Sequence, residues 1–96
     1  MQDHRSSGLE AWAKSVDAQI PPGAKLEKIS DDASFRRYFR FPGLTHKRIF
    51  VDAPPEWEDN ESFLKISTAL LDAGLNAPEV LSANLEHGYL MITDLG

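Results

Sequence analysis

The stretch Asp32-Ala33-Ser34-Phe35-Arg36-Arg37-Tyr38-Phe39-Arg40 decides how this chain is interpreted. A short polar turn stands directly before a segment in which three arginines are interleaved with three aromatic residues. Aromatic residues favour β-strands. Backbone N–H groups of a turn and guanidinium groups both suit an anion such as a phosphate. The stretch therefore predicts a basic strand beside an anion-binding turn.

Strand alternation assigns the side chains of this stretch to two faces. One face would carry Arg36, Tyr38 and Arg40, and the other Phe35, Arg37 and Phe39. Arg37 would then lie among apolar neighbours, where an unpaired charge is costly. It must pair with a carboxylate or face a ligand anion. The plain structural alternative is a solvated strand whose arginines pair with some of the 15 acidic residues.

The composition of the chain limits its possible fold class, ligands and cellular location. A chain of 96 residues that is 42% apolar and 26% charged is typical of one small globular domain. Its net charge of -5 argues against nucleic-acid binding. No cysteine is present, and the three histidines are scattered, so no metal-ligand cluster is expected. No apolar run approaches the roughly 20 residues of a membrane span, and no signal peptide is apparent. We expect a cytoplasmic protein without membrane contact.

Periodicity along the chain predicts an α+β fold. We expect one helix over residues 8–20, opened by a capping box of Ser7 and Glu10. A second helix is predicted over residues 61–73, capped by Asp59 or Asn60. Strands are predicted over residues 24–30, 34–41, 47–51, 79–84 and 89–93. This order indicates a five-stranded antiparallel sheet with helices packed on it.

The second helix carries its own signals. Apolar residues at helical spacing predict the face that packs on the sheet. They are Phe63, Ile66, Leu70 and Ala73, with Leu64 and Leu71 widening the stripe. Gly74 predicts a Schellman end, and Pro78 prevents the helix from continuing.

Four segments together resemble the N-terminal lobe of the aminoglycoside phosphotransferase family, which has a protein-kinase-like fold. They are residues 32–40, Val51-Asp52-Ala53-Pro54-Pro55, residues 73–81 and residues 88–96. The nearest branch contains bacterial kinases that phosphorylate the anomeric hydroxyl of N-acetylmuramate and N-acetylglucosamine. The resemblance implies an N-terminal helix and linker over residues 1–23. It also implies an ATP-binding lobe over residues 24–96 that ends at the hinge, with the C-terminal catalytic lobe absent from this chain.

The resemblance also implies a function. The full-length protein would transfer the γ-phosphate of ATP to a hydroxyl of a small molecule, an amino sugar, and this fragment alone would be inactive. The Mg²⁺ ligands and the acceptor site would lie in the C-terminal lobe. Within this chain, the cofactor-binding residues would be the phosphate-covering turn, the arginines, Tyr38 beside the adenine, Met91 behind it, and the hinge. They are Asp32, Ala33, Ser34, Arg36, Arg37, Tyr38, Met91, Ile92 and Asp94.

The sequence departs from the family at two positions. The third strand usually carries a lysine that reaches the ATP phosphates, and the alignment places Asp52 there. The following helix usually carries a glutamate that pairs with this lysine, and Phe63 stands near that position, with Glu61 half a turn earlier. We therefore hypothesise that Arg36 or Arg37 supplies the missing positive charge, with Asp52 as a possible partner.

Other interpretations remain open at this point. Asp94-Leu95-Gly96 resembles the metal-binding Asp-Phe-Gly motif of kinases, but no catalytic loop precedes it, which favours a hinge. A self-standing α+β module could instead bind a phosphate or an acidic ligand through Arg36, Arg37 and Arg40. A single-strand nucleic-acid binder using the same strand is the weakest alternative because of the net charge.

Overall fold

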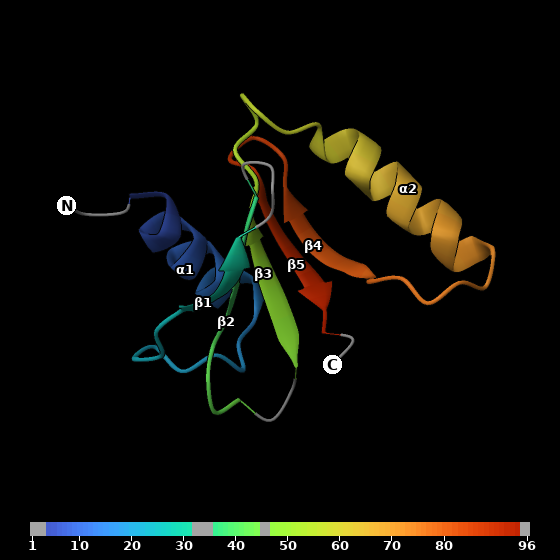
Figure 1. Ribbon diagram of the computed structural model, residues 1–96. Coiled ribbons are helices and arrows are strands. Elements are labelled where there is room, and N and C mark those ends of the chain that lie inside the picture. The colour runs from blue at the N-terminus through green and yellow to red at the C-terminus, as the bar shows by residue number, and fades with distance from the viewer. Residues whose placement is uncertain (1–3, 32–35, 45–46, 95–96) are drawn as a thin grey trace.

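The computed structural model describes residues 4–31, 36–44 and 47–94, and in these residues it confirms the α+β prediction (Figure 1). The elements are α1 (His4–Val16), β1 (Glu27–Asp31), β2 (Arg37–Arg40), β3 (Arg48–Asp52), α2 (Asn60–Asp72), β4 (Val80–Asn84) and β5 (Tyr89–Thr93). The strands form one antiparallel sheet in the order β1-β2-β3-β5-β4. This order is consistent with the small lobe of a kinase-like fold.

The helix α1 begins four residues earlier than predicted. Ser7 therefore lies inside the helix, and the predicted capping box is wrong. Glu10 instead accepts a hydrogen bond from the backbone N–H of Leu26 at 2.8 Å. Leu9 and Ala13 are both fully buried. Tertiary contacts of this kind, rather than a local cap, set the position of the helix.

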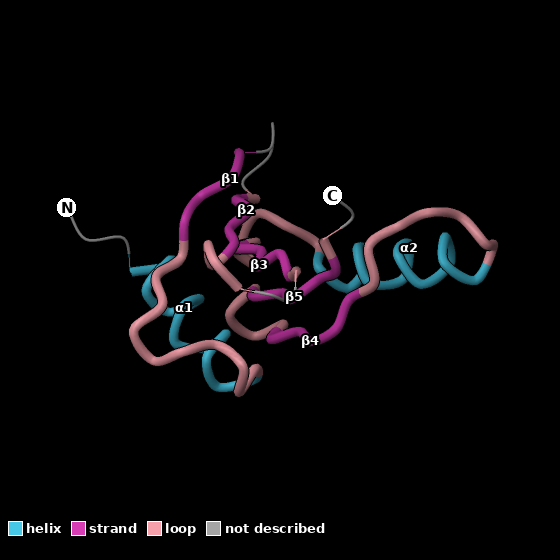
Figure 2. The backbone as a smooth tube through the Cα atoms, turned by 90° about the horizontal axis from the view of Figure 1, so that it is seen from below, coloured by secondary structure: helices cyan, strands magenta, loops and turns pink. Residues whose placement is uncertain are grey.

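The two helices lie on opposite sides of the sheet, as the view from below shows (Figure 2). On the α1 side, one apolar cluster contains Leu9, Ala13, Ile20, Phe39, Phe41, Phe50, Tyr89 and Met91. On the α2 side, a smaller cluster contains Val51, Ala53, Leu90 and Ile92, with Tyr38, Ile49, Phe63, Leu64 and Val80 packed against it. Neither helix in the described residues is long and apolar enough to cross a membrane.

Both ends of α2 follow the sequence prediction. Asp59 is the N-cap, since its carboxylate accepts a hydrogen bond from the backbone N–H of Ser62 at 3.1 Å. At the other end, Gly74 has a φ of 79°. The backbone N–H groups of Gly74 and Leu75 donate to the carbonyls of Leu71 and Leu70, both at 3.0 Å. These two bonds form the expected Schellman motif.

The face of α2 that turns to the sheet differs from the prediction. Phe63 and Leu64 pack on the α2-side cluster, and buried Ser67 donates to the carbonyl of Pro78 at 2.6 Å. Ile66 and Leu70 remain 60% and 39% exposed, so the predicted stripe is only partly right. The cause is the direction of the helix, whose C-terminal half lies away from the strands (Figures 1 and 2).

Candidate functional site

Cross-strand partners show which side chains share a face of the sheet. Arg37 on β2 lies opposite Asp52 on β3, in register with the pair Phe39 and Phe50. Phe39 and Phe50 belong to the cluster on the α1 side. Arg37 and Asp52 therefore point to the α1 side. Tyr38 lies opposite Val51 and points to the α2 side.

Asp52 is a buried carboxylate held between two arginines. Its side chain is only 1% exposed. Arg37 donates to Asp52 Oδ2 from Nε at 3.0 Å and from Nη2 at 2.5 Å. Arg5 from α1 donates to Asp52 Oδ1 from Nε at 2.7 Å. Of the two arginines considered as partners of Asp52, Arg37 is the one that pairs with it, and Arg36 pairs with Glu58 instead.

Arg5, near the start of α1, also contacts the turn between β4 and β5. Its Nη2 donates to the carbonyl of His87 at 2.6 Å, and its guanidinium lies 5.1 Å from the ring centroid of Tyr89. The β4–β5 turn that carries His87 is itself fixed at Gly88, whose φ is 78° and whose carbonyl accepts from the backbone N–H of Ala53 at 2.8 Å. The arginine therefore joins α1, β3 and this turn.

Asp52 stands where the resemblance predicted a lysine. According to that resemblance, the lysine would pair with the helix after the third strand and would face α2. In this chain Asp52 faces α1, and the β3 side chains in or against the α2-side cluster belong to Ile49 and Val51. The carboxylate is therefore part of a structural ion-pair network with Arg5 and Arg37.

Arg36 lies on the α2 side. Its Nε forms an ion pair with Glu58 Oε1 at 2.7 Å, and its guanidinium carbon lies 5.0 Å from the ring centroid of Phe63. The side chain of Arg36 is 26% exposed and that of Glu58 is 9% exposed. The ring against Arg36 is thus that of Phe63, the residue near the position where the resemblance predicted a glutamate.

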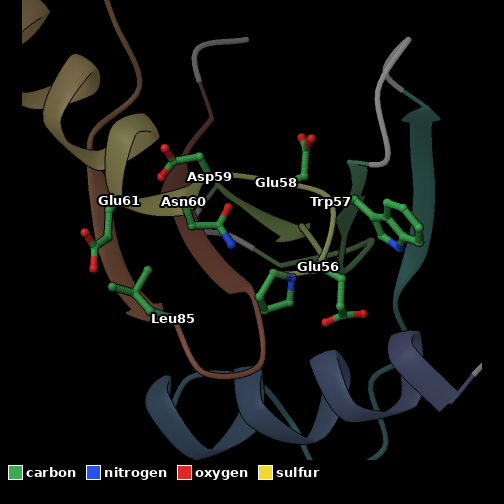
Figure 3. A pocket seen from close by; sticks show the side chains of 8 residues that line it. Glu56, Trp57, Glu58, Asp59, Asn60, Glu61 and Leu85 are labelled. Carbon is green, nitrogen blue, oxygen red and sulfur yellow. The ribbon is translucent and has the colours of Figure 1, made fainter.

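A pocket of about 480 Å³ lies along the loop that contains Glu58 (Figure 3). Its lining is strongly acidic and consists of Pro55, Glu56, Trp57, Glu58, Asp59, Asn60, Glu61 and Leu85. Buried Asn60 holds the loop by donating from Nδ2 to the carbonyl of Ala53 at 2.9 Å. No three histidine, aspartate or glutamate side chains in the described ranges are placed to hold a metal ion.

The other end of the sheet carries a second ion pair and a second pocket. Arg40 at the end of β2 pairs with Asp94, just after β5, at 2.8 Å. Next to this pair, a pocket of about 240 Å³ is lined in part by Phe41, Lys47 and Arg48. The predicted hinge therefore contacts the arginine strand directly through Asp94.

The remaining predicted site residues are distributed as follows. Asp32, Ala33 and Ser34 lie outside the described residues. Tyr38 is half-buried on the α2 side, and Ile92 is buried there. Met91 is 8% exposed and packs in the α1-side cluster. Its side chain and that of Tyr38 are thus on opposite faces of the sheet.

Sequence reasoning missed Arg5 and Glu58. Arg5 lies 47 residues from Asp52 along the chain, and no local pattern connects them. Glu58 stands in the segment between the third strand and the second helix, which carried no periodic signal. The sequence indicated only that the arginines of the basic strand need carboxylate partners. It did not indicate which carboxylates these are.

Curated bacterial kinases are similar to this chain. N-acetylmuramate/N-acetylglucosamine kinase from Pseudomonas aeruginosa is 45% identical over 87 residues, which are 91% of this chain and 24% of that protein. The Pseudomonas putida protein of that name is 41% identical over 78 residues, covering 81% of this chain and 23% of the relative. The Neisseria meningitidis protein of that name is 38% identical over 93 residues, covering 96% of this chain and 27% of the relative.

The chain spans about a quarter of the length of these curated relatives. No family model matches the chain. No solved structure matches it significantly.

Proposed function

We propose that this chain is the ATP-binding small lobe of a kinase that phosphorylates an amino sugar, and that it belongs to the aminoglycoside phosphotransferase family. The similarity to three proteins named N-acetylmuramate/N-acetylglucosamine kinase carries the proposal. The strand order and the helix between β3 and β4 support it. The catalytic groups, the Mg²⁺ ligands and the acceptor site would belong to the remaining part of a longer protein.

A nucleoside triphosphate would bind on the α2 side. ATP would supply the γ-phosphoryl group, and its phosphates would need positive charge from this face. Phosphoryl transfer depends on positioning and charge neutralisation more than on covalent chemistry by the protein. Arg36 stands two residues past the predicted phosphate turn, on the face where the family lysine would point, and it would neutralise the phosphates. Tyr38 and Ile92 would hold the adenine on this same face.

Of the two arginines that could supply positive charge to the phosphates, we assign this role to Arg36. Arg37 is bound to the buried carboxylate of Asp52 on the α1 side. Arg36 lies on the α2 side. Its side chain is 26% exposed and that of Arg37 is 27% exposed, so the face of the sheet, and not exposure, distinguishes the two. The proposal therefore assigns the phosphate contact to Arg36 and leaves out Met91, whose side chain packs against α1.

The alternative of a self-standing module that binds an acidic ligand receives less support. All three arginines of the basic strand already pair with carboxylates of this chain, namely Glu58, Asp52 and Asp94. Arg37 and Arg40 are engaged within the chain in this way, and the similarity to proteins named as kinases favours a nucleotide over an acidic partner.

The full-length protein that carries this chain provides the test. It should transfer phosphate from Mg²⁺-ATP to N-acetylmuramate or N-acetylglucosamine, with the sugar phosphate detected by ³¹P NMR. Nucleotide binding, measured by calorimetry, should be present in the full-length protein. Absence of both nucleotide binding and transfer to either sugar would refute the proposal. Transfer by residues 1–96 alone would refute the claim that the catalytic groups lie elsewhere.

A further inference from the structure

We infer that Glu58 is a positioning residue that fixes Arg36 for contact with the nucleotide phosphates. The inference rests on the proposed function. It starts from a cluster of three side chains, Arg36, Glu58 and Phe63, which we call the Arg36 cluster. The first precedes β2, the second lies in the β3–α2 loop and the third belongs to the first turn of α2.

The Arg36 cluster limits the movement of the guanidinium on two sides. The ring of Phe63, with its centroid 5.0 Å from the guanidinium carbon, makes a cation–π contact. Glu58 Oε1 lies 2.7 Å from Nε and attracts the positive charge, although the Nε–H is not aligned for a hydrogen bond. A free arginine side chain samples many rotamers. A guanidinium that is already ordered loses less conformational entropy when it binds an anion.

Glu58 is itself held by a rigid loop. The backbone N–H groups of Trp57 and Glu58 both donate to the carbonyl of Pro54 at 3.0 Å. Asn60 ties the loop to the carbonyl of Ala53, and Asp59 caps α2. With the side chain of Glu58 only 9% exposed, solvent competes weakly for its charge. The position of Arg36 is therefore coupled to the start of α2 and to the end of β3.

The neighbouring carboxylates of the acidic pocket differ from Glu58 in direction. Glu56 and Glu58 project to opposite sides of the loop (Figure 3). Both Glu56 and Glu61 are exposed. Glu56→Gln thus removes the same charge from the same loop, and it serves as the matched control for Glu58→Gln.

The test is steady-state kinetics of the full-length protein with ATP as the varied substrate. Glu58→Gln should raise the KM for ATP by about tenfold, the effect of losing roughly 1.4 kcal/mol of binding. Glu56→Gln should leave this KM close to the wild-type value. Because Glu58 acts through Arg36, adding Glu58→Gln to Arg36→Ala should raise the KM for ATP little further. Glu58→Asp, which retains the carboxylate, should recover part of the affinity.

The other outcomes overturn the inference without touching the proposed function. If wild-type protein transfers phosphate and Glu58→Gln has the wild-type KM for ATP, Glu58 does not position Arg36. Losses of ATP affinity that add fully in the double variant would show that Glu58 does not act through Arg36. A loss of affinity that only follows a lowered melting temperature would show a purely structural role. A larger effect of Glu61→Gln than of Glu58→Gln would assign the positioning role to the helix glutamate. Wild-type protein without nucleotide binding would instead refute the proposed function.

Discussion

The two faces of the sheet differ in how completely they are buried by the helix that covers them. On the α1 side, Leu9 and Ala13 are fully buried, and Arg5 and Arg37 enclose the carboxylate of Asp52. On the α2 side, the buried cluster is smaller, and the helix leaves Ile66 and Leu70 exposed. The charged groups therefore differ between the two sides. On the α1 side they connect the helix to the sheet, and on the α2 side we propose that Arg36 contacts a ligand.

This difference explains why two adjacent arginines receive different roles. Arg36 and Arg37 are neighbours in sequence, and strand alternation sends their side chains to opposite faces. Arg37 takes part in the network around Asp52, which fastens α1 to the sheet. Arg36 is held by Glu58 and Phe63 on the α2 side, and its side chain is about as exposed as that of Arg37.

The largest expected effect concerns the packing of the α1 side. Leu9→Ala should lower the free energy of unfolding by about 2–5 kcal/mol, because it opens a cavity in a fully buried site. Leu70→Ala, at a position that is 39% exposed on α2, should cost less than about 1 kcal/mol. Urea unfolding followed by tryptophan fluorescence measures both. Equal losses in the free energy of unfolding would contradict the conclusion that the α1 side is the more tightly packed of the two.

A somewhat smaller effect is expected at the buried carboxylate. Asp52→Asn removes the charge shared by Arg5 and Arg37 and should destabilise the fold by about 2–3 kcal/mol. The loss stays below that of a fully buried pair because the two arginine side chains are 32% and 27% exposed. Chemical unfolding of wild type, Asp52→Asn and the exposed control Glu86→Gln tests this. A stability loss no larger than that of the control would remove Asp52 from the structural network.

The smallest expected effect concerns the cap of α2. Hydrogen bonds from the hydroxyl and backbone N–H of Ser62 lower the pKa of Asp59 below its ordinary value of 3.8. The stability that this carboxylate contributes is present above pH 3.8 and is lost as the pH falls through the lowered pKa. Asp59→Asn keeps a capping side chain that does not titrate. The stability difference between wild type and this variant should therefore shrink in acid, and a difference independent of pH would contradict the cap.

Sequence reasoning reached much of the fold because its signals were local. Alternation around Phe39 and Tyr38 predicted the faces of β2, and the cap at Asp59 and the glycine at Gly74 marked the ends of α2. The start of α1 was missed because its anchor is Arg5, which contacts residues far away in the chain. The inward face of α2 was misjudged because a helix that diverges from the sheet buries only its first turns.

The candidate site was less predictable than the fold. The sequence allowed either arginine to meet the phosphates, since residue types alone do not reveal which face α2 covers. The partner of Arg36 could not be foreseen because Glu58 lies in a loop whose path depends on the carbonyl of Pro54 and on Asn60. The turn that contains Asp32 stays a prediction.

The most direct test of the account compares ATP affinity in Arg36→Ala and Arg37→Ala variants of the full-length protein, measured by calorimetric titration at a temperature where both are folded. Arg36→Ala should raise the Kd for ATP by about tenfold or more. Arg37→Ala should affect the Kd less and should mainly lower the melting temperature. Wild-type ATP affinity in Arg36→Ala, or weaker binding in Arg37→Ala than in Arg36→Ala, would contradict the account.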